Sequence, residues 1–586
     1  MIDVDALLRN HFQQSNETNN PFVKVAASVL KKLAHQDEIN HFIETNKHFD
    51  GLEFNDAVLD HFNFSFQVSS KDRAHIPDQQ RLLIVANHPL GSLDGLALLK
   101  LVSEIRTDVR IVGTTLLSHI EPLKSVFLSV NNLSKKDNHR KMRQQIITAL
   151  EAEQAVIVFP TNDVSRIRPN GVRDGKWETG FLHAAKKTKT PIVPVFIDGK
   201  NSGLFYSLST IYKPLGTMML LNEMFNQKDG EISFRIGKPI PWESIAELNL
   251  PKKAIAERMR KQVYLLGKKK KKKHELFKSI ENIIYPAKTK LIRKELRDSE
   301  LIGKTRDGKS IYLFDYTPNS SVMREIGRLR ELSFRQVQEG TGNALDIDRY
   351  DRYYRHLILW DEEELEIIGS YRIGEAWEIL KSKGEQGLYT SSLFKFNRAF
   401  VPYLESAIEL GRSFIQPRYQ GKRSLDYLWH GIGAYLHQHP EIKYMFGPVS
   451  LSHSYPAAAQ QMIASFYTEL FGCDKSFVIP EQPFDFAQIK EFSSFGRIAD
   501  ENKYKNAFAV LKEKLAKYGV SVPILYKQYV ELCKPGGCEF LGINIDPKFS
   551  NCVDALILVH ISRIKENKRQ RYIEVHEQTT ENKNAA

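Results

Sequence analysis

The sequence predicts an α/β protein with two domains, an α/β domain followed by a domain built on a mixed sheet. Two patterns predict this class: in each half, short apolar runs of strand length alternate with helical stretches, and a block of six lysines, Lys268–Lys273, separates the halves. The 586 residues exceed what one core holds, and 42% hydrophobic with 26% charged residues is a globular composition. We therefore expect domains at 1–266 and 306–586, joined by a basic amphipathic linker at 267–305.

The first half contains four apolar runs of strand length: "RLLIVAN", "VRIVGTT", "AVIVFPTN" and "PIVPVFIDG". Between them lie stretches with helical periodicity, such as "HRKMRQQIITALEAEQ" and "TGFLHAAKKTKT". Strands that alternate with helices in this way are typical of an α/β sheet. The carboxyl ends of such strands are where α/β proteins bind ligands.

A histidine and an aspartate directly follow the first of these runs, in "VANHPLGSLDG". His88 is suited to take a proton from an alcohol, provided a carboxylate such as Asp94 fixes its tautomer and orientation. Gly91 and Gly95 allow the close backbone approach that such a turn needs. The alternative is a tight turn that merely contains a histidine.

A second polar turn follows another buried run, in "FPTNDVSRIRPNGVRDGKWETGF", and carries Asp163, Arg166 and Arg168. The segment Leu204–Phe225 is apolar on all sides and is interrupted by Lys213 and Pro214. It is either a pair of core helices or an interfacial segment that gives a lipid access to the site.

The lysine block is followed by "ELFKSIENIIYPAKTKLI", in which the apolar residues recur at helical spacing. Lys268–Lys273 form either a solvated linker or, with this amphipathic neighbour, a contact for anionic membrane. The net charge of +13 also suits nucleic acid or an acidic protein, but no nucleic-acid-binding motif or interleaved aromatic residues support nucleic acid. No apolar run is long enough for a membrane span, and no signal peptide is evident.

The ordered motifs of the first half resemble those of the glycerolipid acyltransferases, in which a histidine deprotonates the acceptor hydroxyl before it attacks an acyl thioester. The resemblance implies that His88 is the base, Asp94 its orienting carboxylate and Asn87 a residue that shapes the turn. Asp163 and Arg166 would lie at the acceptor-binding turn. Five residues instead of four separate the histidine from the aspartate, and Phe-Pro-Thr-Asn-Asp replaces Phe-Pro-Glu-Gly. The wider spacing resembles the branch related to ornithine-lipid acyltransferases, whose acceptor needs no phosphate-binding turn.

The second half begins with a predicted helix that carries Arg330 and Phe334, and "YRHLILWDEEELEIIGSYRIG" then predicts two strands joined by an acidic turn. "SLDYLWHGIGAYLHQH" predicts a helix and "YMFGPVSLS" a further strand. The order of these elements, and of the charged residues that lie among them, resembles that of acyl-homoserine-lactone synthases and ornithine N-acyltransferases, which have GNAT-like folds. The turn "RYQGKRS", with Gly421, would bind the phosphate of a pantetheine arm at the start of a helix. A second glycine is absent, and Lys422 and Arg423 suit an acidic acyl carrier protein better than coenzyme A.

The resemblance implies amide formation in the second half, so the amine of an amino acid must lose a proton before it attacks the thioester. Glu409 is the first candidate for the base and Asp351 the second. Arg372 and Arg412 pair with these carboxylates or bind the carboxylate of the acceptor, and Asp348 also belongs to the substrate site. The alternative is that these five residues form a structural ion-pair network.

The two resemblances cover nearly the whole chain and together imply a bifunctional ornithine-lipid synthase. The second half would attach a 3-hydroxyacyl chain to ornithine, and the first half would acylate the hydroxyl of the resulting lyso-lipid, with no metal or redox cofactor. We expect acyl carrier protein as the partner and a bacterial, cytoplasmic location on the inner face of the membrane. The alternatives are a membrane-tethered synthase of an acyl-amino-acid signal, and a non-enzymatic protein that binds membrane or nucleic acid.

Four cysteines in so long a chain indicate a reducing compartment. Cys533, Cys538 and Cys552, with His560, could bind a metal. Their spacing contains no C-x-x-C pair, which argues against a zinc site. The segment around them, near the C-terminus, would either complete the second domain or pair the two halves.

Overall fold

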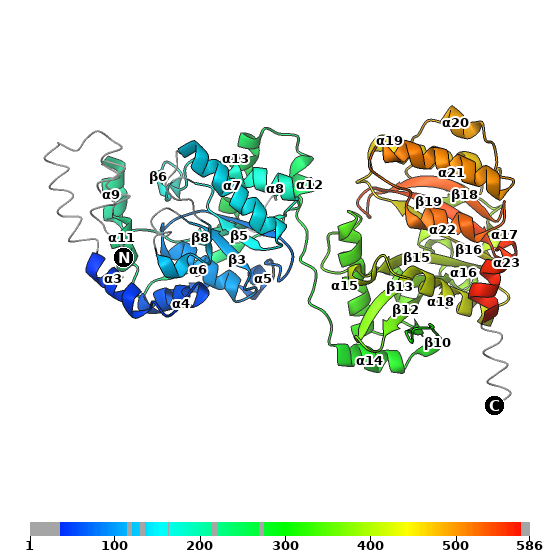
Figure 1. Ribbon diagram of the computed structural model, residues 1–586, viewed down its shortest axis with the longest axis horizontal. Coiled ribbons are helices and arrows are strands. Elements are labelled where there is room, and N and C mark those ends of the chain that lie inside the picture. Colours follow the sequence, from blue (N-terminus) through cyan, green and yellow to red (C-terminus); the bar gives the residue numbers. More distant parts are fainter. Residues whose placement is uncertain are drawn as a thin grey trace. The chain divides into compact units, whose positions relative to one another are not determined.

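The computed structural model describes residues 35–113, 120–128, 135–161, 163–211, 219–268 and 275–575. The chain forms two compact units, Met1–Asn282 and Ile283–Ala586. The division falls within the segment 267–305 that the sequence indicates as a linker. Each unit contains one large sheet covered by helices (Figure 1).

The N-terminal unit is built on a seven-stranded sheet with the order β1-β9-β8-β2-β5-β3-β4. Strand β2 lies in the middle and pairs in parallel with β5 and β8, whereas β8 and β9 are antiparallel. The four apolar runs correspond to β2, β3, β5 and β8, as predicted. The strands are β1 Ser65–Gln67, β2 Leu82–Ala86, β3 Val109–Val112, β4 Phe127–Leu128, β5 Ala155–Val158, β8 Ile192–Asp198 and β9 Glu231–Ile236.

Helices cover both faces of this sheet, which explains why its central strands are apolar at every position (Figure 1). Leu82, Ile84 and Ala86 pack with α4 and α6 on one face, while Leu83 and Val85 pack with α7, α8 and α13 on the other. All five residues of β2 are fully buried. These helices are α4 Leu52–His61, α6 Leu93–Ser103, α7 Lys135–Glu151, α8 Gly180–Thr188 and α13 Lys252–Leu266.

Shorter elements complete this unit. The hairpin of β6 and β7 follows β5, and the predicted apolar segment contains helices α9 and α11, with 212–218 outside the described residues. Tyr206 is buried, but Leu204 is 60% exposed, so the segment is only in part core. The elements are α3 Gln36–Thr45, α5 Ser70–Arg73, β6 Arg166–Arg168, β7 Gly171–Arg173, α9 Gly203–Ile211, α11 Leu220–Asn226 and α12 Trp242–Ala246.

The C-terminal unit is built on an eight-stranded mixed sheet with the order β10-β11-β12-β13-β15-β16-β19-β18. Strands β15 and β16 form its parallel pair, and they are hydrogen-bonded only from Ala407 to Glu409. Beyond that point the two strands diverge. The strands are β10 Glu300–Lys304, β11 Ser310–Phe314, β12 Arg355–Asp361, β13 Glu366–Glu375, β15 Ala407–Ile415, β16 Tyr444–Leu451, β18 Cys538–Asp546 and β19 Cys552–His560.

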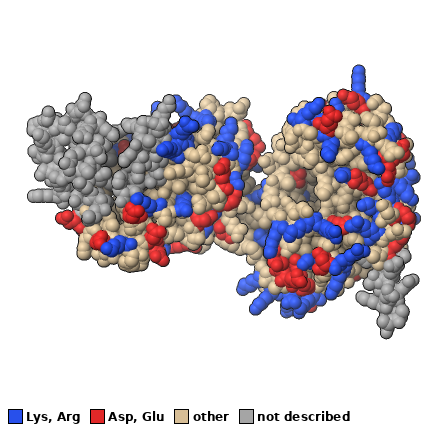
Figure 2. Space-filling model, viewed as in Figure 1, with Lys and Arg blue, Asp and Glu red and all other residues tan. Residues whose placement is uncertain are grey.

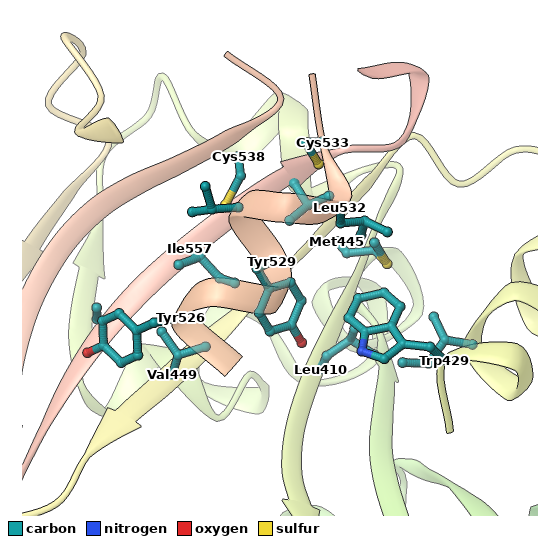
Figure 3. Close-up of a cluster of buried hydrophobic side chains, with 14 of the residues drawn as sticks. Leu410, Trp429, Met445, Val449, Tyr526, Tyr529, Leu532, Cys533, Cys538 and Ile557 are labelled. Carbon is teal, nitrogen blue, oxygen red and sulfur yellow. The ribbon is translucent and has the colours of Figure 1, made fainter. Parts of the chain in front are cut away.

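One face of this sheet packs against α18, α19, α21 and α22 in a single large apolar cluster, part of which Figure 3 shows around Trp429 and Tyr529. The other face packs against α14 and α15 at one end and α16 at the other. Strands β18 and β19 complete the sheet, so the C-terminal segment belongs to this domain. The helices are α14 Thr289–Arg297, α15 Ser321–Gln336, α16 Ala376–Lys383, α17 Val401–Leu404, α18 Ser424–Gln438, α19 Ala457–Phe471, α20 Lys490–Ser493, α21 Glu501–Ala516, α22 Ile524–Leu532 and α23 Glu566–Arg569; β14 Phe394–Phe396 and β17 Val478–Pro480 form a separate pair.

The helix suggested by the spacing after the lysine block is not formed. Described residues 275–288 contain no helix, and the next one is α14. Phe277 is buried against α13, with Arg258 over its ring, so the apolar side chain packs into the N-terminal unit instead of forming a free stripe. Lys269–Lys273 lie outside the described residues. Among the described helices, none has the length and hydropathy needed to span a bilayer.

Candidate active sites

The histidine and aspartate predicted as a pair are in contact at the carboxyl end of β2. His88 Nδ1 lies 3.0 Å from Asp94 Oδ2. Strand β2 ends at Ala86 and α6 begins at Leu93, so the turn between them brings the two side chains together. Gly91 has φ +88°, and a Cβ there would lie 2.4 Å from a methyl group of Val164, so the turn requires glycine.

Asp94 is fully buried and is held by backbone amides as well as by the imidazole. Its Oδ2 accepts from Leu90 N at 2.9 Å and its Oδ1 from Gly95 N at 3.0 Å. Burial raises the pKa of this carboxyl group, but His88 and the backbone amides outweigh burial, so the pKa is lowered. Asp94 is therefore a fixed negative charge facing the imidazole.

The contact with Asp94 determines which ring nitrogen of His88 is available to substrate. Because Nδ1 faces the carboxylate, Nε2 is left to receive a proton. The side chain is 13% exposed, and the ring stacks on Phe159 with centroids 4.3 Å apart. Burial lowers the pKa of His88, but the charge of Asp94 outweighs it, so the pKa is raised. This arrangement is that of an oriented general base.

The other predicted residues of the first site also lie near this turn. Asn87 bonds β8 through both ends of its amide, donating to Ile197 O at 2.9 Å and accepting from Ile197 N at 2.7 Å. Asp163 and Arg166 form a two-bond ion pair at 2.9 and 3.1 Å. The Arg166 guanidinium also lies over the Phe205 ring. Asn87 thus fixes the turn, while Asp163 occupies one edge of Arg166.

The charged residues predicted for the second site lie on one face of the C-terminal sheet. Side chains alternate along a strand, and the neighbours of His356, Arg372, Glu409 and Asp554 pack into the apolar cluster on the opposite face. These four therefore point to the face that carries α15 and α16. On that face the four side chains form a polar stripe across β12, β13, β15 and β19. The stripe lies between the apolar cluster that includes α15 and the one that includes α16.

Asp351 is fully buried beside the stripe. Its Oδ1 accepts from Arg330 at 2.7 Å and from Arg372 at 3.3 Å, and its Oδ2 accepts from Asp348 N at 2.8 Å. Burial raises the pKa of this carboxyl group, but Arg330 and Arg372 outweigh burial and hold the pKa far below its ordinary value. His356, beside Arg330, has its pKa lowered to about 4 by burial and is neutral at pH 7.

The guanidinium groups of Arg372 and Arg412 both lie over the Tyr389 ring, at 5.2 and 5.1 Å from its centroid. Arg372 also donates to Asp348 at 2.7 Å. Arg412 has φ +49° and follows a register shift between β13 and β15, where the strand begins to separate from β16. Such a bulge redirects a side chain, and here it places Arg412 3.4 Å from Asp346.

Glu409 is fully enclosed by hydrogen-bond donors. Thr390 N donates to Oε1 at 2.7 Å, Tyr389 N donates to Oε2 at 3.1 Å, and the Tyr354 hydroxyl also donates to Oε2. Burial raises its pKa, which makes the protonated form easier to reach. The carboxylate therefore has the basicity of a proton acceptor, and it also holds the turn at Tyr389.

Several residues of the stripe were not singled out in the sequence. Tyr389 donates to Asp546 at 3.0 Å, and Asp554, 1% exposed, has its pKa raised to about 7 by burial. Both carboxylates come from the C-terminal strands, to which we assigned no chemistry. The signal for Asp554 in the sequence was an aspartate inside an otherwise apolar run, "CVDALILV", where burial of an acidic side chain indicates a specific role.

The predicted donor turn lies at the start of α18. Gly421 has φ +74°, and Lys422 and Arg423 are exposed. Arg418 is paired with Glu364 at 2.6 Å and Glu366 at 2.9 Å. Figure 2 shows Lys and Arg side chains beside Asp and Glu side chains in the lower part of this unit. A depression of about 410 Å³ is lined by Lys309, Asp361, Glu363, Arg418, Lys422 and Arg423 among others.

The cysteines do not converge on one site. Cys533 and Cys538 lie in the apolar cluster of Figure 3, while Cys552 packs into a different cluster against α15. His560 contacts Glu539 at 3.2 Å. Within the described ranges, no group of three or more His, Cys, Asp or Glu side chains is arranged to hold a metal ion.

Comparison with known families matches both halves of the chain. Residues 17–275 match the family described as acyltransferase, and residues 329–430 match the acetyltransferase (GNAT) domain. The chain is 32% identical over 308 residues to a glycine N(alpha)-acyltransferase of Phocaeicola vulgatus, across 50% of this chain and 93% of that protein. It is 31% identical over 259 residues to a lyso-glycine lipid O-acyltransferase of Bacteroides thetaiotaomicron, across 43% of this chain and 92% of that protein.

A third relative is an L-ornithine N(alpha)-acyltransferase of Brucella abortus, 34% identical over 149 residues, which are 23% of this chain and 51% of that protein. The matches place an acyltransferase domain first and a GNAT domain second, in the order that the motifs predicted. The chain therefore belongs to the acyltransferase families of these relatives and is an enzyme that joins an O-acyltransferase type and an amino-acid N-acyltransferase type in one polypeptide.

Proposed function

We propose that this enzyme makes an amino-acid-containing membrane lipid in two steps. The C-terminal half transfers a 3-hydroxyacyl chain from a thioester to the α-amine of an amino acid, and the N-terminal half then acylates the 3-hydroxyl of that chain. The observation that carries the proposal is the His88–Asp94 pair at 3.0 Å in a chain whose relatives perform both reactions.

In the N-terminal half, the acceptor hydroxyl would lie at His88 Nε2. As the hydroxyl oxygen attacks the thioester carbonyl carbon, its proton passes to Nε2, and the resulting imidazolium is stabilised by Asp94. Collapse of the tetrahedral intermediate breaks the C–S bond, and the thiol leaves with that proton. An ester and a free carrier thiol result, without a covalent enzyme intermediate.

In the C-terminal half, the amine must reach a thioester at the divergence of β15 and β16. Glu409, the first candidate from the sequence, would take the proton that the amine loses; Asp351, the second, is the weaker base because Arg330 and Arg372 hold its pKa far below its ordinary value. Arg372 and Arg412 contact the Tyr389 ring and would hold the carboxylate of the acceptor. Asp348, which Arg372 contacts at 2.7 Å, would position that arginine.

Two amino acids are candidate acceptors. Ornithine is the one predicted from the sequence and the one named for the Brucella relative. Glycine is favoured by the length of the match, because the Phocaeicola glycine enzyme is covered over 93% of its length.

Mass spectrometry of lipids from a host expressing the chain tests the proposal and identifies the acceptor. A lipid with one amide-linked and one ester-linked chain is expected, and its head-group mass distinguishes ornithine from glycine. A product with a single acyl chain would instead indicate a signal synthase. The absence of any acylated amino acid would contradict the proposal.

We propose acyl carrier protein, rather than coenzyme A, as the donor to the C-terminal half. Glu364 and Glu366 neutralise Arg418, so the donor turn offers Lys422 and Arg423 to a partner. Asp361, which lines the same depression, is paired with Lys309 at 2.8 Å, so Lys422 and Arg423 are the charges that an acidic carrier protein would contact.

Charge reversal at both Lys422 and Arg423 is expected to raise the KM for acyl-acyl carrier protein about tenfold or more while changing kcat little. The reason is that a docking contact acts equally on the ground and transition states. Reversal of the exposed Lys512 and Lys517, on and just after α21, is the matched control and should leave KM unchanged. Equal or faster turnover of acyl-coenzyme A by the unmodified enzyme would exclude the proposal.

We also propose that the enzyme binds the inner face of the cytoplasmic membrane peripherally, because its acceptor is a lipid and Lys268–Lys273 are cationic. Each lysine contributes about 1 kcal/mol near an anionic surface. Replacing the six lysines by glutamine should abolish flotation with anionic vesicles, and high salt or alkaline carbonate should release the unmodified enzyme. Full retention under both treatments would contradict peripheral binding.

A further inference from the structure

The hairpin of β6 and β7 contacts the catalytic histidine at both of its ends. At its entry, Ser165 N donates to His88 O at 2.8 Å. At its exit, His88 N donates to Asp174 Oδ1 at 3.2 Å. Both polar groups of the His88 backbone are therefore held by a hairpin that lies more than seventy residues away in the sequence.

Asp174 is itself rigidly held. Its Oδ1 also accepts from the Ser165 hydroxyl at 2.5 Å, its Oδ2 accepts from Trp177 Nε1 at 2.9 Å, and its backbone N donates to the Tyr264 hydroxyl at 2.8 Å. Its exposed fraction is 0%. Burying a carboxylate costs free energy, so an aspartate at this position destabilises the fold unless its charge has a function.

The charge of Asp174 also acts on the imidazole. Burial lowers the pKa of His88, Asp94 raises it most strongly, and Asp174 raises it further. Burial raises the pKa of Asp174 above its ordinary value and outweighs the donors from Ser165, Trp177 and His88, which lower it. His88 is thus flanked by one carboxylate at its ring and another at its peptide group.

We propose that Asp174 is a positioning residue for the O-acyl transfer, holding the His88 peptide group and placing a second carboxylate beside the catalytic base. The inference rests on the proposed function of the N-terminal half. It also assigns a task to the "FPTNDVSRIRPNGVRDGKWE" segment: with the Asp163–Arg166 pair in its turn, the segment fixes the base instead of binding a phosphate.

The test is the pH profile of kcat/KM for O-acylation in the variant Asp174→Asn/Trp177→Phe. The second change avoids setting an amide NH₂ against the indole N–H. Loss of the carboxylate should shift the acid limb of the profile to lower pH by roughly half a unit or more, because His88 loses one of the three carboxylates, Asp94, Asp174 and Asp163, whose charges raise its pKa. Activity at the optimum should fall less in this variant, whose amide oxygen can still accept from His88 N, than in Asp174→Ser, whose shorter side chain leaves the base poorly aligned.

Two controls separate this effect from a general loss of structure. Trp177→Phe alone keeps the carboxylate and should leave the acid limb in place. Asp78→Asn removes an exposed carboxylate before the amino end of β2, the end opposite to His88, and should change neither rate nor profile. N-acylation by the other half serves as an internal standard for enzyme concentration.

An unshifted acid limb in the double variant would overturn the proposal, even if the rate is low, because a purely structural role changes the rate alone. If the double variant does not unfold cooperatively, the pH profile of kcat/KM is measured for Asp174→Asn and Asp174→Ser instead. An unshifted acid limb in either of these variants, when folded, would also overturn the proposal. Failure of the O-acyltransferase assignment itself would be seen separately, as full activity in His88→Ala.

Discussion

His88→Ala is expected to lose O-acylation by roughly 100- to 10,000-fold, the usual contribution of a positioned general base. The residual enzyme should still form the amide, because the amine is activated in the other half. Cells carrying the variant should therefore accumulate the mono-acylated amino acid and lack the two-chain lipid. Quantifying both lipids by mass spectrometry, and O-acylation of supplied lyso-lipid in vitro, measures the effect.

Asp94→Asn should be nearly as severe. The amide would have to accept from Leu90 N and Gly95 N, as the carboxylate does at 2.9 and 3.0 Å, while also facing His88 Nδ1. Because the amide has only one oxygen for these donors, its NH₂ group faces His88 Nδ1. This favours the tautomer with the proton on Nε2, which cannot accept the proton of the hydroxyl. Phe159→Leu removes the stacked ring but keeps the pair, so its loss should be much smaller.

The pH dependence gives a further check on the same pair. The pKa of His88 is raised, so in the unmodified enzyme the base is protonated at acidic pH and O-acylation increases as the pH rises through that value. Two-chain lipid made at the normal rate by His88→Ala would mean that "NHPLGSLD" is only a turn, and the mechanism of the first half would be wrong.

The first site could be predicted because its chemistry is local in the sequence. His88 and Asp94 are separated by one turn between β2 and α6, and the complete burial of β2 appears in the sequence as an uninterrupted apolar run. The partners of this pair were beyond sequence reasoning. Asp174 reaches His88 only because the β6–β7 hairpin folds back, and no periodicity encodes that return.

The second site was predicted as a set of residues but not as an arrangement. The sequence indicated Glu409 and Asp351, but the donors that surround Glu409 come from positions 354, 389 and 390, brought together by a sheet with non-sequential strand order. Helical spacing after the lysine block was misleading for a related reason. Phe277 finds burial against α13, and that tertiary contact replaces the amphipathic helix.

Glu409→Gln and Arg372→Lys are expected to remove both lipids, because without N-acylation the first half has no hydroxylated acceptor. Glutamine places an NH₂ group against the donors from Tyr389 and Tyr354, and lysine cannot reproduce the contacts of Arg372 with Asp348 and Asp351. We expect a loss of N-acylation of about 100-fold or more in each. Arg398→Lys, at an exposed arginine of the same unit, is the control and should be unaffected.

Supplied lyso-lipid separates the two halves in these variants. Because their His88 site is intact, Glu409→Gln and Arg372→Lys should convert external lyso-lipid to the two-chain lipid at the normal rate, whereas His88→Ala should not. A melting curve for each variant then distinguishes a catalytic loss from a structural one. If the residues form a structural ion-pair network, Tm should fall in proportion to the lost activity. If their role is catalytic, activity should be lost while Tm is nearly unchanged. If both variants form the amide at the normal rate, neither Glu409 nor Arg372 takes part in N-acylation, and the proton of the amine must pass to another group. Asp554, with its pKa raised to about 7 by burial, would be the first to test.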